Sequence, residues 1–202
     1  MRQGFPKKSI FVFVIAACLV IAMLACPGCS SYTDPGIIAS SPVDVSILKP
    51  LKNYPGYSAD ELKARLDVLQ EDESVQLQST FGNDQVSIYD YYMDSGGVEV
   101  SFYIYGTLAG AKSGYESDKT NGPFADVTPK MVTVSQDVEA ALYPIYWYRS
   151  TENFGRYTDP KCLDTEIRIG NMTISLSEQS DNQHTIGQST NKALKQIVQV
   201  LE

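Results

Sequence analysis

The sequence holds a single histidine, His184, and three of its four cysteines lie within the first 29 residues. One histidine cannot supply a metal site built from two imidazoles, and a serine–histidine–aspartate site would depend on this residue alone. His184 stands in a polar run, residues 180–184, that is typical of an exposed loop. The GxSxG, HExxH and glycine-rich phosphate-loop motifs are also absent. The sequence therefore predicts no catalytic residue, no metal site and no cofactor.

Basic residues are scarce beyond the N-terminus. All 24 acidic residues lie after residue 33, whereas three of the 16 Lys and Arg residues precede it. Residues 26–202 therefore carry 13 basic and 24 acidic side chains, a formal net charge of −11. Such a charge repels polyanions, so nucleic acid and bare anionic lipid are not expected as partners. Cys162 is either buried and reduced or paired with Cys26 or Cys29, and no disulfide framework holds the fold.

The N-terminus has the pattern of an export signal. Three basic residues within the first eight precede seventeen uncharged, mostly apolar residues, 9–25, and Cys26 follows directly on the small residue Ala25. This junction resembles the lipobox of bacterial lipoprotein precursors, in which the cysteine receives a diacylglyceryl thioether before cleavage in front of it. The resemblance implies that residues 1–25 are a lipoprotein signal peptide and that Cys26 is lipidated.

Two alternatives remain open at this end of the chain. Cys29 follows Gly28 and precedes two serines, as in many lipoproteins, but Pro27 occupies a place where signal-peptidase sites rarely carry proline. The apolar segment could also stay uncleaved as a short membrane helix. Because the basic residues are retained inside, either alternative puts the remaining chain on the extracytoplasmic side of the cell membrane.

The segment after the signal predicts a tether and one domain. Five of the ten prolines fall between residues 27 and 55, interleaved with serines. Because proline opposes helices and central strands, residues 26–57 are expected to form an extended tether. The alternation of Val43, Val45 and Ile47 favours a short edge strand there instead. Residues 58–202 are long enough for a single extracytoplasmic domain with a sizeable core.

Apolar periodicity within 58–202 predicts an α+β fold, an antiparallel meander sheet packed with N- and C-terminal helices. Ser58 and Glu61 form a capping box at the start of a helix over 58–70. A second helix is expected near 108–121, and apolar residues at helical spacing end the chain, from Leu194 to Leu201. The expected strands are 75–81, 85–93, 98–105, 131–135, 141–149 and 165–176, the last with a possible turn at 170–171. Pro144 marks the strand at 141–149 as an edge strand or a bulged one.

The thirteen tyrosines are the one residue type that stands out for function. A turn of three loop residues after the strand at 85–93 would pair residue 90 with residue 102 and gather the apolar residues of both strands on one face. The opposite face would then collect four tyrosines, Tyr89, Tyr91, Tyr103 and Tyr105. A second aromatic cluster, Tyr146, Trp147 and Tyr148, lies on the strand at 141–149.

Aromatic faces can stack on sugar rings or receive a partner peptide. The candidate ligand-binding residues are therefore Tyr89, Tyr91, Tyr103, Tyr105 and Trp147. The alternative explanation is that tyrosine simply suits half-buried strands.

These features predict a lipid-anchored module of the cell envelope that binds or assembles with an envelope protein or a glycan, through the tyrosine face or by strand addition at 141–149. Its membrane contact is the N-terminal lipid, whose acyl chains hold it on the extracytoplasmic face. The alternatives are an envelope hydrolase centred on His184 and a non-catalytic accessory subunit. An exposed tyrosine face with His184 in solvent would favour binding, whereas a cleft joining His184 to a serine and an aspartate would favour the enzyme.

Overall fold

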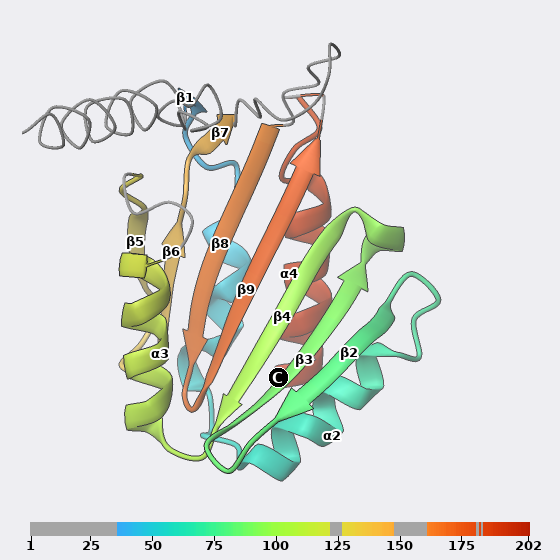
Figure 1. The fold of residues 1–202 in the computed structure, drawn as a ribbon, viewed down its shortest axis with the longest axis vertical. Coiled ribbons are helices and arrows are strands. Elements are labelled where there is room, and N and C mark those ends of the chain that lie inside the picture. The colour runs from blue at the N-terminus through green and yellow to red at the C-terminus, as the bar shows by residue number, and fades with distance from the viewer. Residues whose placement is uncertain (1–35, 122–126, 148–160, 181, 183) are drawn as a thin grey trace, which may run out of the picture.

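The computed structural model describes residues 36–121, 127–147, 161–180, 182 and 184–202. They form an α+β fold in which one nine-stranded antiparallel sheet is flanked by helices (Figure 1). The strands are β1 (Gly36–Ala39), β2 (Gln76–Gly82), β3 (Val86–Met93), β4 (Val98–Tyr105), β5 (Lys130–Thr133), β6 (Val138–Leu142), β7 (Ile145–Trp147), β8 (Lys161–Ile169) and β9 (Met172–Ser180). The helices are η1 (Val45–Asn53) and η2 (Asp94–Gly96), both 3-10, and α2 (Ala59–Leu69), α3 (Leu108–Asn121) and α4 (Gln188–Leu201).

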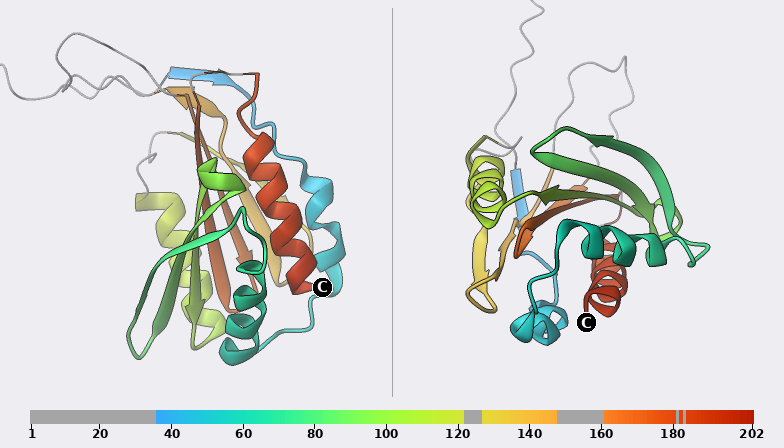
Figure 2. Two further views of the ribbon diagram at one scale, coloured as in Figure 1. Left: turned by 90° about the vertical axis from the view of Figure 1, so that its right-hand side faces the viewer. Right: turned by 90° about the horizontal axis from the view of Figure 1, so that it is seen from below.

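Neighbouring strands follow the order β1-β7-β8-β9-β4-β3-β2, while β6 pairs with both β5 and β8. One face of this sheet packs against α2, α4 and η1, and α3 lies against the other face (Figure 2). The main core lies between the sheet and the first group of helices. Alternate β4 residues such as Val100 and Phe102 meet α4 residues such as Leu194 and Ile197 there, and all four are almost fully buried.

The start of α2 confirms the predicted capping box. The backbone N–H of Ser58 donates to Glu61 Oε2 at 2.8 Å, and the N–H of Glu61 donates to Ser58 Oγ at 3.3 Å. Each residue thus satisfies a backbone donor that the first helical turn leaves free. Leu62, Leu66 and Leu69 then bury one stripe of the helix in the core.

The turn between β3 and β4 differs from the prediction. Met93 pairs with Val98, so the turn holds four residues, 94–97, rather than three. Asp94 and Ser95 both adopt positive φ, 52° and 55°, which L residues rarely do. The Asp94 carboxylate accepts from Ser189 Oγ at 2.7 Å and from Lys192 Nζ, both on α4. Contacts with α4 therefore hold a turn that the local glycines alone do not specify.

The extra turn residue moves two tyrosines to the other face of the sheet. Tyr89 pairs with Phe102 and Tyr91 with Val100, so both point into the main core. Tyr91 is 1% exposed, and its ring meets that of Phe102 edge-on at a centroid distance of 5.5 Å. The predicted face shared by Tyr89, Tyr91, Tyr103 and Tyr105 is therefore wrong. A one-residue shift in register exchanges the two faces of a strand.

The predicted strand at 141–149 is divided at Pro144 into β6 and β7, which run one after the other along β8. Neither is an edge, because β6 also pairs with β5, and β7 also pairs with β1. The prediction of strand addition there is thus wrong, since proline ended one strand rather than marking the sheet edge. The predicted run at 165–176 is the β8–β9 hairpin, whose two-residue turn has Gly170 at a φ of 57°.

Part of the predicted tether belongs to the fold. Residues 36–39 pair with β7 as β1, and residues 45–53 form η1 rather than an extended segment or an edge strand. Val43, Ile47, Leu48 and Leu51 are buried in the main core. The core therefore extends across the boundary placed at residue 57. Proline did not prevent helix formation in this segment, because Pro50 lies within a 3-10 helix and not within a longer α-helix.

Cys26 and Cys29 lie outside the described residues. Within the described ranges, no helix is both long and apolar enough to span a membrane. Cys162 is buried on β8, and desolvation raises the pKa of its thiol to about 11. Such a thiol carries little thiolate at neutral pH and is a poor nucleophile.

Candidate functional site

The candidate site is the side of β2, β3 and β4 that points away from α2 and α4, which we call the open face. Of the described helices, α3 alone packs on this side of the sheet, over β4, β8 and β9, and the β2–β3 half is left uncovered (Figure 2). The open face consists of Ser79, Phe81, Val86, Ile88, Asp90, Tyr92, Glu99, Ser101, Tyr103 and Tyr105.

An apolar row of three side chains crosses the open face. Phe81 pairs with Ile88, and Ile88 pairs with Tyr103, so the three lie side by side on adjacent strands. Phe81 is 66% exposed, and the other two are half-buried. Because strands lie about 4.8 Å apart, the two aromatic residues are separated by about 10 Å across the sheet. The apolar row thus presents two ring-bearing side chains to solvent with an aliphatic one between them.

A polar row runs parallel to the apolar row and continues onto β9 and β8. It consists of paired residues on five strands: Ser79, Asp90, Ser101, Ser175 and Glu166. Asp90 accepts from Ser79 Oγ at 2.5 Å and from Ser101 Oγ at 2.7 Å, and Ser175 Oγ donates to Glu166 Oε1 at 2.7 Å. Serine hydroxyls rather than cations therefore satisfy both carboxylates of the row.

A groove of about 630 Å³ lies where the open face meets α3. Tyr105 and Val86 line its sheet side, and small residues of α3, including Gly110, Ser113 and Gly114, line its helix side. A Cβ atom on Gly114 would lie 2.1 Å from Tyr105 Oη, whereas one on Gly110 would lie 3.4 Å from the ring. The absence of a side chain at Gly114 therefore lets α3 lie close against the Tyr105 ring.

Three carboxyl groups lie near one another where α3 covers the sheet: Asp118 on α3, and Asp164 and Glu166 on β8. Desolvation, reinforced by the charges of Asp118 and Asp164, raises the pKa of Glu166 to about 8. Desolvation also raises the pKa of Asp118 and of Asp164, even though Tyr146 donates its hydroxyl to Asp164.

Arg168, a buried cation on the same strand as Asp164 and Glu166, is paired elsewhere. The Arg168 Nε donates to Glu139 Oε1 at 2.7 Å, and another guanidinium nitrogen, NH2, donates to the Gln136 carbonyl at 3.0 Å. No three His, Cys, Asp or Glu side chains in the described ranges are placed to share a metal ion. Burial thus favours the protonated form of each of these carboxyl groups.

The structure does not bring the predicted site residues together on one face. Tyr103 and Tyr105 lie on the open face, whereas Tyr89 and Tyr91 lie in the core. Trp147 ends β7, paired with Gly36 and Lys161, and its side chain is outside the described part of the structure. The prediction of five residues acting together is therefore not supported by their positions.

Sequence reasoning missed Phe81 and Ile88. A regular strand would place Leu77 and Phe81 on the same face, but the register of β2 shifts between Leu77 and Ser79. This bulge leaves Leu77 beside core-facing Tyr91 and turns Phe81 to the open face beside Ile88. The order of apolar and polar residues in the sequence does not indicate a bulge of this kind.

His184 is exposed, and its backbone N–H donates to Asn182 Oδ1 at 2.9 Å in a local turn. Its imidazole makes no hydrogen bond or ion pair with any residue that the structure describes. The described residues therefore do not assemble a serine–histidine–carboxylate arrangement around it.

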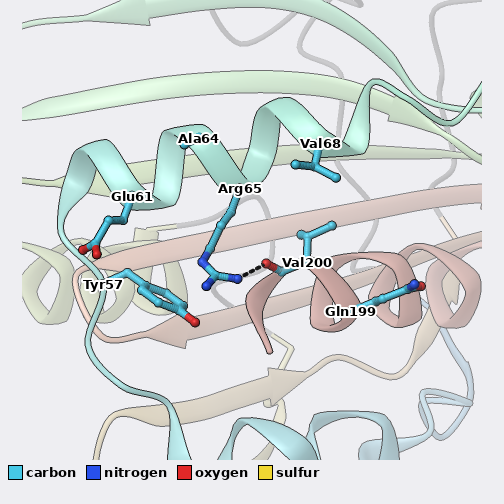
Figure 3. Close-up of a pocket in the computed structure, with 7 residues that line it drawn as sticks. All are labelled: Tyr57, Glu61, Ala64, Arg65, Val68, Gln199 and Val200. Atoms are coloured by element: carbon cyan, nitrogen blue, oxygen red, sulfur yellow. Dashed lines mark hydrogen bonds between the residues drawn. The ribbon is translucent and has the colours of Figure 1, made fainter.

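A second surface groove, of about 500 Å³, lies between α2 and the end of α4 (Figure 3). Arg65 occupies it. One guanidinium nitrogen donates to the Val200 carbonyl at 2.7 Å, and the guanidinium carbon lies 3.8 Å from the centroid of the Tyr57 ring. Since this contact satisfies a carbonyl that the helix end leaves free, we assign the groove a structural role in docking α2 to α4.

No model of a known protein family matches this chain, and a search of curated proteins finds none that matches it. The open face and the pattern of the N-terminus are therefore the two features that bear on its function.

Proposed function

We propose that the chain is a lipid-anchored binding module on the extracytoplasmic side of the cell membrane, and that the open face is its recognition surface for an envelope protein or a glycan. The observation that carries the proposal is the apolar row, in which Phe81, 66% exposed, and half-buried Ile88 lie on the uncovered β2–β3 half of the sheet and half-buried Tyr103 continues the row onto β4. Apolar surface that remains exposed beside polar residues is typical of interaction sites.

The side chains of the open face suit binding better than catalysis. Aromatic rings supply contact area at a low cost in conformational entropy and stack on sugar rings or on peptide side chains. The neighbouring polar row offers hydroxyl and carboxylate groups that can fix the orientation of a ligand. Because His184 lies in solvent, its position does not support the alternative of a hydrolase. No observation specifically favours the alternative of an accessory subunit.

The anchor is tested by labelling with radioactive palmitate. We expect Cys26→Ser to abolish incorporation and Cys29→Ser to retain it, because Ala25-Cys26 closes the uncharged segment. The opposite pattern would move the lipid to Cys29. Incorporation into neither the parent chain nor the two variants would remove the anchor from the proposal.

The recognition surface is tested in cells by site-specific photo-crosslinking. A photoreactive aromatic amino acid is placed at Phe81 on the open face or, as a matched control, at Val68, which is 47% exposed on α2 on the other side of the sheet. We expect discrete adducts from position 81 and none from position 68, and Tyr103→Ser should lower the yield at position 81. Equal adducts from both positions would contradict the proposal.

A further inference from the structure

Among the described residues, no strand covers the edge of the sheet next to the open face. β2 ends the strand order, and only β3 pairs with it in the described part of the chain (Figure 1). The N–H of Asn83 donates to the Val86 carbonyl at 2.9 Å. Because alternate residues of an antiparallel strand hydrogen-bond to the same neighbour, Ser79 and Phe81 bond to β3. The backbone N–H and C=O groups of Thr80 and Gly82 then point away from β3, toward the unpaired side of β2.

This edge lacks most of the features that keep natural edges from pairing. Its seven residues, 76–82, include no charged residue and no proline. Lysine and proline are the common protective residues of edge strands. The bulge between Leu77 and Ser79 restricts the regular part of the edge to Ser79–Gly82. That stretch is long enough to pair with a short extended segment.

The chain around this edge is acidic. Residues 66–111, which include all of β2, β3 and β4, contain no Lys or Arg. They contain eight acidic residues: Asp67, Glu71, Asp72, Glu73, Asp84, Asp90, Asp94 and Glu99. Lys192 of α4 pairs with Asp94, while Asp90 and Glu99 lie on the open face. A basic partner is thus electrostatically favoured, and a second copy of this acidic chain is disfavoured.

We propose that β2 accepts a basic extended segment of a partner protein as an added strand of the sheet. Backbone groups of Thr80 and Gly82 pair with the segment, which is the recognition mode of β-augmentation. On the open face, one side chain of the segment lies beside Phe81, and the side chain two positions away lies beside Ser79 and Asp90. The first position therefore suits an apolar residue and the second a lysine or arginine. This inference rests on the proposed function and names its ligand class.

The test measures binding of a fluorescent peptide to the full chain in detergent micelles by anisotropy. The probe is an eight-residue peptide with threonine at every odd position and lysine and valine by turns at the even positions. As an extended strand, it presents threonines on one face and alternating basic and apolar residues on the other. We expect saturable binding that weakens as salt rises. Thr80→Pro removes an outward N–H without removing an internal hydrogen bond and should weaken binding about tenfold, as expected for one or two lost backbone hydrogen bonds.

Three controls separate strand pairing from general attraction. Thr80→Val keeps the outward N–H and should bind as the parent chain does. The same peptide with alternate N-methyl groups keeps its charge and composition but cannot pair, and should bind about tenfold more weakly. Asp90→Asn should weaken binding and reduce its dependence on salt. Hydrogen exchange at the Thr80 and Gly82 amides should slow in the complex.

The outcomes distinguish this inference from the proposed function. Equal binding to Thr80→Pro and Thr80→Val, or equal binding of the N-methylated peptide, would overturn strand addition. No binding of the probe would overturn it too, and crosslinks from position 81 would still support the open face. A dimer that Thr80→Pro abolishes, with no binding of the probe, would replace the basic partner with a second copy of the chain.

Discussion

Glu166 carries a carboxyl group whose surroundings strongly raise its pKa. Its carboxyl group lies between β8 and α3, accepts a hydrogen bond from Ser175, and has the carboxyl groups of Asp118 and Asp164 nearby. The folded protein raises its pKa from 4.5 to about 8. Between these values the folded chain retains a proton that the unfolded chain has released. The free energy of unfolding should therefore fall as pH rises through this window and level off above about 8.

We predict that Glu166→Gln removes part of this pH dependence. The amide oxygen can still accept from Ser175, and the variant should be more stable than the parent chain at pH 8.5 by roughly 2–4 kcal/mol. Thermal and urea unfolding measured from pH 5 to pH 9 checks this. Asp118 and Asp164 also have raised pKa values, so a weaker slope should remain. Glu116→Gln, on the exposed side of α3, is the matched control and should leave the slope unchanged. An unaltered slope in Glu166→Gln would contradict the prediction.

Residue-level patterns predicted which tyrosines lie on β3 and β4 but not which of them share a face. The strand spans and the core-facing side of β4 were predictable, because Val98, Val100, Phe102 and Ile104 alternate without interruption. The positions of Tyr89 and Tyr91 depend on a turn that contacts Ser189 and Lys192 nearly a hundred residues later. A local sequence window contains no information on such a contact, so half of the predicted tyrosine site was misplaced.

At the scale of elements, the packing of α3 on β4 depends on one glycine. A Cβ at Gly114 would lie 2.1 Å from Tyr105 Oη and 2.6 Å from Tyr105 Cζ, so either the ring or the helix must move. A Cβ at Gly110, one turn earlier, would come no closer than 3.2 Å to any atom, Thr107 Oγ1 being the nearest. The two glycines therefore differ in the space that they leave for a side chain, although both lie on the same helix.

We predict that Gly114→Ala lowers the free energy of unfolding by roughly 1–3 kcal/mol, because overpacking outweighs the gain in helix propensity. Gly110→Ala should change it by less than about 1 kcal/mol. Urea unfolding of both variants checks this, and Gly110→Ala is the control for the general effect of alanine in α3. Equal effects of the two substitutions would show that the Tyr105 contact does not limit the approach of the helix.

The sequence predicted elements better than their connections. Helices α2 and α3 and the β2–β3–β4 meander fall within a few residues of the expected spans, and α4 contains the expected apolar stripe from Leu194 to Leu201 but begins earlier, at Gln188. The division of 141–149 at Pro144 and the formation of η1 in a proline-rich segment were not predicted. Both features depend on which strand or helix the short segment packs against in the folded chain. Proline restricts local backbone geometry but does not specify that neighbour.

At the scale of the whole molecule, the N-terminal segment 36–57 completes one side of the main core. η1 packs against α4, and Asp44 and Pro42 are joined to Asn191 of that helix by hydrogen bonds. The side chains that this segment buries are Val43, Ile47, Leu48 and Leu51. Each fully buried aliphatic side chain contributes about 1.5–3 kcal/mol, so the four together contribute roughly 6–12 kcal/mol. This is comparable to the whole stability of a typical domain, about 5–15 kcal/mol.

We therefore predict that residues 58–202 do not fold cooperatively alone, whereas residues 36–202 do. The proline content of 26–57 suggested a fragment boundary at residue 58, but removing η1 would expose the side of α4 that η1 covers, along with core residues beneath it. Thermal unfolding of the two fragments, followed by circular dichroism, tests this. In the full chain, Leu48→Ala should lower the free energy of unfolding by about 2–5 kcal/mol, and Lys49→Ala, at an exposed neighbouring position, should have little effect. A cooperative transition of 58–202 at the same temperature as that of 36–202 would contradict the prediction. Residues 36–57 would then belong to the tether, and the domain would start at residue 58.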